Sequence, residues 1–264
     1  MPAADIRLEL ETGSVKLTSP FYLRRMAGSE VEEHAAAQGT TTIVKGPRQI
    51  GKSSPMAHVW AQAIKREQRS CYLDFKTIET PDLESLDKLL RRLASEMAEQ
   101  LLGIQDTLTL PWNDKLGPGH NLSNYLEKAI LAHSKSAVLM VFDDADRVFQ
   151  FPYRDDFFTL IRGWHDKRAT NDLWCRLNLI IAHSTEPHLW IQNVVERSPF
   201  NVGLRLTLDD FDLEGISQLN ARHGHPLKTS GDIQQLSGLV AGHPYLIRRG
   251  LYALARNKWS IAQL

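Results

Sequence analysis

One segment, Gly46–Ser53 (GPRQIGKS), constrains the fold of this 264-residue chain more than any other. It matches the pattern G-x-x-x-x-G-K-[ST], and the β-branched run Thr40–Lys45 leads directly into it. A helical pattern follows from Lys52 to Gln68. Glycines let the backbone curl so that its N–H groups face inward, and a helix start adds further N–H groups and a favourable dipole. A strand, this loop and a helix in this order predict a phosphate-binding α/β fold.

Each position of this phosphate loop has an expected role. Lys52 should reach the β- and γ-phosphates of a nucleotide as a point charge, and the hydroxyl of Ser53 should bind Mg²⁺. Pro55 lies in the first helical turn, where a missing N–H is tolerated. The expected nucleotide-binding set is Gly46, Pro47, Arg48, Gln49, Ile50, Gly51, Lys52, Ser53 and Ser54.

Strand-like and helical segments alternate over the first 208 residues. Further strands are predicted at 71–75, 137–142, 177–182 and 204–208, and helices at 83–102, 121–133 and 155–167, with Asn121 or Ser123 as a helix cap. Strands separated by helices predict right-handed crossovers and a parallel five-stranded sheet covered on both faces.

The pattern changes near residues 208–211. Short helical stretches punctuated by Gly and Pro occupy the rest of the chain. We therefore expect an α/β core at residues 1–208 and a small all-helical C-terminal subdomain at residues 209–264.

A second part of the site is expected after the most apolar strand, AVLMVF, which is followed by Asp143 and Asp144. Asp143 should face Mg²⁺ through water, because this ion keeps part of its hydration shell. Asp144 is the candidate to orient or deprotonate the attacking water. The long interval between Lys52 and Asp143 leaves room for an extra strand, which favours a P-loop ATPase with an additional central strand.

A third part is expected after the strand at 177–182, where His183, Ser184 and Thr185 are the polar candidates for a position near the γ-phosphate. We favour Ser184. The chain has no [NT]KxD tetrapeptide of the kind that recognises guanine, so the expected cofactors are ATP or ADP with Mg²⁺.

Composition excludes several other classes of protein. Lys and Arg total 31, as do Asp and Glu, which argues against a strongly basic nucleic-acid coat but leaves room for a local basic patch. The apolar run Ala137–Phe142 is far shorter than the roughly 20 residues of a membrane span, and the N-terminus has no apolar signal region. Cys71 and Cys175 are too few for a disulfide framework. We expect a cytoplasmic protein.

Six segments make nearly the whole chain resemble the AAA-like ATPase domain family, which comprises signal-transducing P-loop ATPases related to STAND and AAA+ proteins. They are SPFYLRR, GPRQIGKSS, VFDDADRVF, LIIAHSTEP, SPFNVGLRLTL and GHPYLIRRGLYALAR. The resemblance implies that GHPYL is the GxP element of STAND proteins, with Pro244 beside the bound nucleotide. It also implies that Phe21, Tyr22 and Arg24 belong to the segment that wraps the adenine.

The chain also departs from its relatives. AAA+ enzymes usually carry Glu after the Mg²⁺-binding Asp, whereas Asp144 is one methylene shorter, and a mispositioned base slows hydrolysis. No arginine finger is evident, and the candidates are Arg197, Arg205, Arg248 and Arg249.

These features together predict a slowly hydrolysing molecular switch, in which Mg·ATP controls the arrangement of core and helical subdomain. A protein effector, a sensor partner or self-association would read the change. Two alternatives stay open: an AAA+ regulator that assembles on DNA, which the charge balance does not favour, and a scaffold that binds nucleotide without hydrolysing it.

Overall fold

The computed structural model describes residues 8–10, 15–16, 18–103, 112–184 and 199–264. The chain divides into two units. The α/β unit comprises Ala27–Lys45 and Met56–Thr207, and the helical unit comprises Met1–Met26, Gly46–Pro55 and Leu208–Leu264. The helical unit thus includes the phosphate loop. A division into residues 1–208 and 209–264 stays a prediction.

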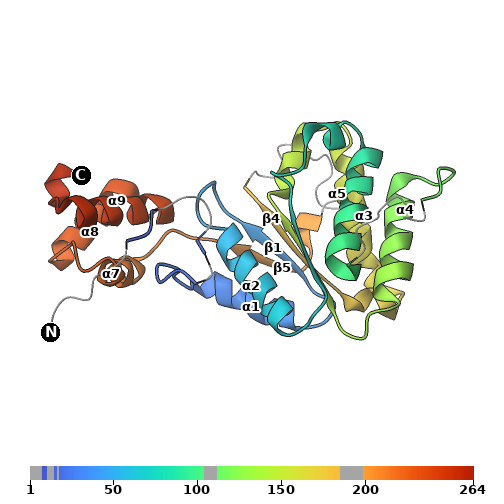
Figure 1. Cartoon of the computed structure of the whole chain (residues 1–264), viewed down its shortest axis with the longest axis horizontal. Helices are drawn as coiled ribbons and strands as arrows, with labels where there is room; N and C mark the ends of the chain where they lie inside the picture. Colours follow the sequence, from blue (N-terminus) through green and yellow to red (C-terminus); the bar gives the residue numbers. More distant parts are fainter. Residues whose placement is uncertain (1–7, 11–14, 17, 104–111, 185–198) are drawn as a thin grey trace. The chain divides into compact units, whose positions relative to one another are not determined.

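The sheet of the α/β unit has five parallel strands in the order β2-β3-β4-β1-β5, as predicted (Figure 1). They are β1 (Thr41–Lys45), β2 (Ser70–Asp74), β3 (Val138–Asp143), β4 (Leu177–His183) and β5 (Leu204–Thr207). Every residue of β3 and β4 is buried, which explains their unbroken apolar runs. β4 lies between β1 and β3, so it is the strand that separates the phosphate-loop strand from the strand ending at Asp143.

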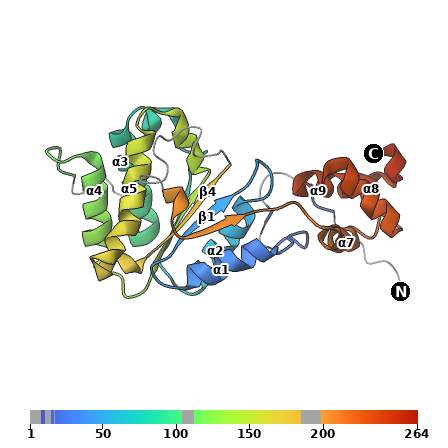
Figure 2. The ribbon, with the colours of Figure 1, turned by 180° about the vertical axis from the view of Figure 1, so that it is seen from behind.

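Among the described residues, five helices belong wholly or mainly to this unit: α1 (Met26–Ala36), α2 (Ser53–Lys65), α3 (Leu86–Met97), α4 (Pro118–Tyr125) and α5 (Arg154–Asp166). α1 and α2 lie side by side, and α3 packs against α4, which in turn packs against α5 (Figure 2). The apolar faces of α3, α4 and α5 and the strands enclose a core that includes Phe142, Phe157, Trp164 and Trp174.

Two predicted helices differ in detail. The segment at 83–102 begins at the end of a 3-10 turn (Thr80–Leu83) and continues as α3 and a π-helical turn (Ala98–Leu102), which is followed by Gly103 with φ +67°. The helix predicted at 121–133 begins at Pro118, and its N-cap is Gly117. Asn121 and Ser123 are therefore not caps. Asn121 instead bonds the backbone of Asn113, and Ser123 accepts a hydrogen bond from the Trp164 indole.

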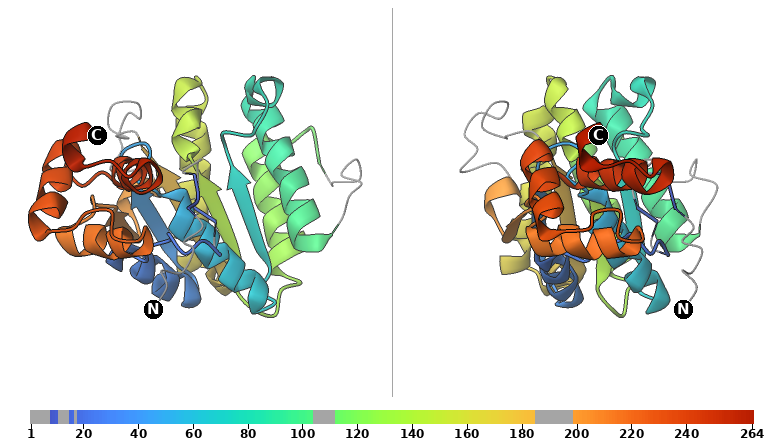
Figure 3. Two further views of the ribbon diagram at one scale, coloured as in Figure 1. Left: turned by 60° about the vertical axis from the view of Figure 1, so that its left-hand side comes forward. Right: turned by 90° about the vertical axis from the view of Figure 1, so that its left-hand side faces the viewer.

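The helical unit contains α7 (Leu213–Arg222), α8 (Ser230–Val240) and α9 (Pro244–Asn257), drawn in orange to red in Figure 3. α7 is capped by Asp212, and α8 by a capping box between Thr229 and Asp232. Pro244 occupies the first position of α9, where its missing N–H costs nothing. The apolar core of this unit includes Ile216, Leu219, Leu236, Ile247, Leu251 and Leu254.

Two residues of the segment SPFYLRR, Phe21 and Leu23, belong to this core. Phe21 is 1% exposed, and its ring centroid lies 4.3 Å from that of His223. Arg222 donates hydrogen bonds to the carbonyls of Pro20 (2.9 Å) and Tyr22 (2.6 Å). The structure thus gives Phe21 a packing role. Within the described residues, no helix has the length and apolar character needed to cross a bilayer.

Candidate functional site

The phosphate loop has a tightly curled backbone. The chain passes from Lys45, the last residue of β1, straight into Gly46, and α2 begins at Ser53. Gln49 (φ +63°) and Gly51 (φ +90°) are left-handed, and a β-carbon at Gly46 would lie 2.9 Å from Ile50 Cγ2. The two glycines of the motif are therefore required by backbone conformation and by close packing.

Lys52 folds back over the start of the loop. Its side chain is buried, and Nζ donates hydrogen bonds to the carbonyls of Gly46 (2.8 Å) and Pro47 (2.9 Å). An ammonium group thus lies at a curled loop that leads into a helix N-terminus, and both features attract anions. The phosphate-binding role of Lys52 stays a prediction.

The other loop positions have different environments. Pro47, Arg48 and Gln49 are exposed, whereas Ile50 is buried. Ser53 is the first residue of α2, and Ser54 Oγ accepts a hydrogen bond from the Val15 amide (3.2 Å). The Ser54 hydroxyl therefore already has a structural role.

Sequence reasoning missed Arg25. Its guanidinium donates hydrogen bonds to the carbonyls of Ile50 (2.7 Å) and Gly51 (3.4 Å) through Nη2, and to the carbonyl of Asp209 (2.9 Å) through Nη1. Its Cζ lies 5.6 Å from the centroid of the Phe211 ring. Arg25 therefore joins the phosphate loop to the segment that leads into α7. The only sequence signal was its place in SPFYLRR, where Arg24 is the exposed neighbour.

Asp143 ends β3 and is almost fully buried. Tyr72, on the neighbouring strand β2, donates a hydrogen bond from its hydroxyl to Asp143 Oδ2 (2.7 Å). Burial, together with the negative charge of Asp143, raises the pKa of Tyr72 above its usual range. The tyrosine therefore stays a hydrogen-bond donor that holds this carboxylate in place.

Asp144 has a left-handed backbone (φ +52°) and forms an ion pair with Lys76. Lys76 lies after β2, and Arg147 holds the segment around it by donating to the carbonyls of Phe75 (2.6 Å), Lys76 (2.8 Å) and Ile78 (2.7 Å). Partial burial lowers the pKa of Lys76, but the Asp144 carboxylate outweighs this effect, so the pKa lies above its usual value.

His183 and Ser184 lie at the same edge of the sheet as Asp143, because β4 runs parallel to β3 and pairs with it. His183, the last residue of β4, pairs in register with Lys45 of β1, and its ring packs 4.5 Å from that of Phe200. Ser184 follows directly and is half-buried. Thr185 lies outside the described residues.

The GHP turn is anchored to the segment before α7. The Phe211 amide donates to the Gly242 carbonyl (2.9 Å), and Gly242 has φ +75°. A β-carbon at Gly242 would lie 2.4 Å from the Phe211 carbonyl oxygen. Pro244, two residues later, is buried. The turn and Arg25 therefore hold neighbouring parts of the same segment, at Phe211 and Asp209.

The candidate arginine fingers differ in their surroundings. Arg248 is buried, with its guanidinium 5.6 Å from the centroid of the Phe21 ring. Arg205 and Arg249 are exposed, and Arg197 lies outside the described residues.

The donor atoms suit magnesium. Ser53 offers a hydroxyl and Asp143 a carboxylate, which are the hard oxygen ligands that Mg²⁺ takes beside phosphate and water. No group of three or more His, Cys, Asp or Glu side chains among the described residues could hold a metal ion. A magnesium ion takes further ligands from phosphate and water.

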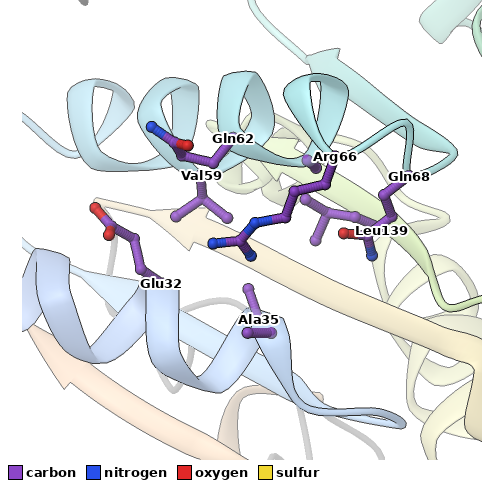
Figure 4. Close-up of a pocket in the computed structure, with 9 residues that line it drawn as sticks. Glu32, Ala35, Val59, Gln62, Arg66, Gln68 and Leu139 are labelled. Carbon is purple, nitrogen blue, oxygen red and sulfur yellow. The ribbon is translucent and has the colours of Figure 1, made fainter.

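A separate pocket lies between α1 and α2. Glu32 of α1 and Arg66, the residue directly after α2, flank it, and Val59 and Leu139 supply apolar walls (Figure 4). Leu139 lies near the beginning of β3, whereas Asp143 is at its end. The pocket is therefore at the opposite edge of the sheet from the carboxylates and forms no part of their site.

The parallel sheet, the phosphate loop and the Asp143 carboxylate at the end of β3 together define a P-loop ATPase fold. The chain belongs to the AAA-like domain family, whose model matches residues 10–264. Comparison with curated proteins gives no match.

Three solved structures illustrate the likeness. A Walker-type ATPase of Pyrococcus abyssi is 15% identical, with a TM-score of 0.54 over 90% of this chain and 69% of its own. The ORC1 protein of Aeropyrum pernix, solved with DNA, is 16% identical, with a TM-score of 0.55 over 88% of this chain and 59% of its own. Domain III of the replication initiation protein DnaA of Thermotoga maritima is 15% identical, with a TM-score of 0.52 over 90% of this chain and 87% of its own. Identities this low establish the fold alone.

Proposed function

We propose that this chain is a nucleotide-dependent switch that binds ATP with Mg²⁺ at the phosphate loop and hydrolyses it slowly. The observation that carries the proposal is Arg25, which bonds the carbonyls of Ile50 and Gly51 and also that of Asp209. A change in the loop would thereby reach the segment that leads into the three C-terminal helices.

The loop would respond to a triphosphate through Lys52. Its ammonium group bonds two loop carbonyls, and phosphate oxygens would compete for the same donors. A charge-assisted bond to phosphate is stronger than one to a neutral carbonyl. The loop would therefore adjust its backbone around the ligand, and Arg25 would carry the adjustment to Asp209.

Magnesium would be held by Ser53 and, through water, by Asp143, and when bound it would neutralise charge on the phosphates. Tyr72 would keep the Asp143 carboxylate oriented. Asp144 would orient the attacking water, and Ser184 would be the polar residue near the γ-phosphate. Pro244 would lie beside the nucleotide, so that the helices respond to which nucleotide is bound.

Slow turnover follows from Asp144 itself. Its side chain is shorter than the usual Glu, and Lys76 engages its carboxylate. A switch requires an ATP state that lasts long enough for a partner to bind it. The nucleotide shifts the conformational equilibrium only by its differential affinity for the two states. Partner proteins or self-association would then distinguish the ATP state from the ADP state.

The test is calorimetric titration of the full chain with ATP, ADP and GTP, with and without Mg²⁺. We expect adenine nucleotides to bind and Lys52→Ala to weaken ATP by at least about 100-fold, since two or more charged hydrogen bonds are lost. Lys65→Ala, at the exposed end of α2, is the matched control. Unchanged ATP affinity in Lys52→Ala would refute the site. Identical small-angle scattering with ADP and with an ATP analogue would refute the switch.

A further inference from the structure

α9 carries a row of tyrosine and arginine side chains. Tyr245, Arg249, Tyr252 and Arg256 follow one another at intervals of four, three and four residues. With about 100° of rotation per residue, these four positions fall within about 60° of each other on the helix. The row is therefore a single narrow stripe along the helix axis, about 16 Å long at about 1.5 Å per residue.

The stripe lies opposite the buried face of α9. Ile247, Leu251 and Leu254 are at most 1% exposed and belong to the core of the helical unit. Tyr245 and Tyr252 are half-buried, and Arg249 and Arg256 are exposed. The core therefore fixes the orientation of the helix, and the stripe is displayed on the other side.

Each arginine is aligned by the tyrosine before it. Arg249 Nη1 donates to the Tyr245 hydroxyl (3.2 Å) and Arg256 Nη1 to the Tyr252 hydroxyl (2.8 Å). The Arg256 guanidinium also lies 5.8 Å from the centroid of the Tyr252 ring. A guanidinium has five N–H donors, so one bond to a tyrosine leaves donors for an anionic ligand.

The local charge differs from that of the whole chain, which is balanced. Asp232 is the last acidic residue, and the following 32 residues carry four cationic side chains, Arg248, Arg249, Arg256 and Lys258. Trp259, directly after these, is 42% exposed. One acidic side chain, Asp210, lies near the start of α9, because its β-carbon is 3.3 Å from where a β-carbon at Gly242 would be.

We propose that this stripe binds single-stranded nucleic acid. Arginines spaced along a helix suit the phosphates of an extended strand, and the half-buried tyrosine rings that alternate with them offer faces for unstacked bases. A folded acidic protein would need the charges but not the alternating rings, and a duplex keeps its bases stacked and out of reach. The proposal is independent of the phosphate loop and holds for a variant that binds no ATP.

The test is fluorescence anisotropy of the full chain with labelled oligonucleotides of about 16 nucleotides, as single-stranded DNA, single-stranded RNA and duplex DNA. We expect a single strand to bind more tightly than the duplex. Arg249→Gln with Arg256→Gln should lower the slope of log affinity against log salt by about 1.4, because each phosphate contact on a single strand contributes about 0.7. Lys128→Gln with Lys135→Gln, which removes two exposed charges elsewhere, should leave the slope unchanged.

The contribution of the tyrosine rings is tested separately. Tyr252→Ala should weaken single-strand binding by about 5- to 150-fold, and Tyr252→Phe should restore most of it, since phenylalanine keeps the stacking face and loses only the hydroxyl that bonds Arg256. Circular dichroism would verify that each variant is folded. The proposal would be overturned if the wild-type chain bound the duplex, polyglutamate or anionic vesicles as tightly as a single strand. It would also be overturned if the arginine variants bound a single strand like the wild type, or if Tyr252→Phe behaved like Tyr252→Ala.

Discussion

Lys76 forms an ion pair with Asp144, the carboxylate proposed to orient the attacking water. The lysine side chain is 66% exposed, so the pair gains little Coulomb energy and contributes at most about 1 kcal/mol. Arg147 holds the backbone on both sides of Lys76 and so fixes the position from which the lysine reaches Asp144. Lys76, in the loop after β2, therefore restrains Asp144 only weakly, and a bound ligand could break this ion pair.

Replacing Lys76 by Ala tests this restraint. We expect ATP turnover to rise by up to about 5-fold, the factor equivalent to about 1 kcal/mol, because Asp144 is freed to orient water. Steady-state phosphate release measures the effect. Lys88→Ala, which breaks the exposed pair with Glu84, is the control and should leave turnover unchanged. A fall in turnover would mean that Lys76 positions Asp144 productively instead of restraining it.

Arg25 gives a second prediction. Arg25→Ala removes hydrogen bonds to Ile50, Gly51 and Asp209, so we expect ATP affinity to fall by about 10-fold as the loop loses its support. We also expect the scattering difference between ADP and ATP-analogue states to shrink. Arg24→Ala removes the same charge from the exposed neighbouring position. If both variants had equal affinities and equal scattering differences, Arg25 would have no coupling role.

The parts of the site that the sequence predicts are those coded by adjacent residues. The phosphate loop is recognisable because strand, glycines, lysine and helix follow one another without interruption, and Asp143 because an apolar strand ends there. The five strands and their parallel arrangement follow from alternating local patterns in the same way. Local periodicity carries this information because neighbouring side chains share one backbone.

The contacts that support the site could not be predicted, since their partners are distant in sequence. Tyr72 and Asp143 are 71 residues apart, and Arg147 and Phe75 are 72 apart. Arg25 bonds a loop residue 25 positions away and Asp209 184 positions away. Nothing near Tyr72, Arg147 or Arg25 marks these pairings. A single sequence cannot distinguish such residues from ordinary surface arginines and core tyrosines.

A pH effect is expected from His223. Burial, opposed in part by a hydrogen bond to the Leu219 carbonyl, lowers the pKa of His223 to about 4. Between pH 6.5 and about 4 the unfolded chain binds a proton at this residue and the folded chain does not, so stability falls as pH falls through this window. The loss should approach about 3 kcal/mol, at about 1.36 kcal/mol per unit. Above pH 6.5 the residue contributes no pH dependence.

Urea unfolding at a series of pH values measures the His223 effect. His223→Gln should flatten the acid side of the stability profile, although its absolute stability will be lower because the ring packs on Phe21. His225→Asn is the control, since His225 is exposed and asparagine tolerates its left-handed backbone. An unchanged slope in His223→Gln would show that other groups cause the acid sensitivity.

Two glycines of the helical unit should respond to alanine in opposite ways. At Gly242 a β-carbon would strike the Phe211 carbonyl oxygen at 2.4 Å, and the backbone has φ +75°, so Gly242→Ala should destabilise the unit by about 2 kcal/mol or more. At Gly238, inside α8, a β-carbon meets nothing within 4 Å, so Gly238→Ala should stabilise it by up to about 1 kcal/mol. Chemical denaturation compares the two variants. Because the Gly242 turn also fixes the segment contacted by Arg25, only Gly242→Ala should weaken ATP binding. Equal ATP affinities of the Gly242→Ala and Gly238→Ala variants would show that this turn has no role in the switch.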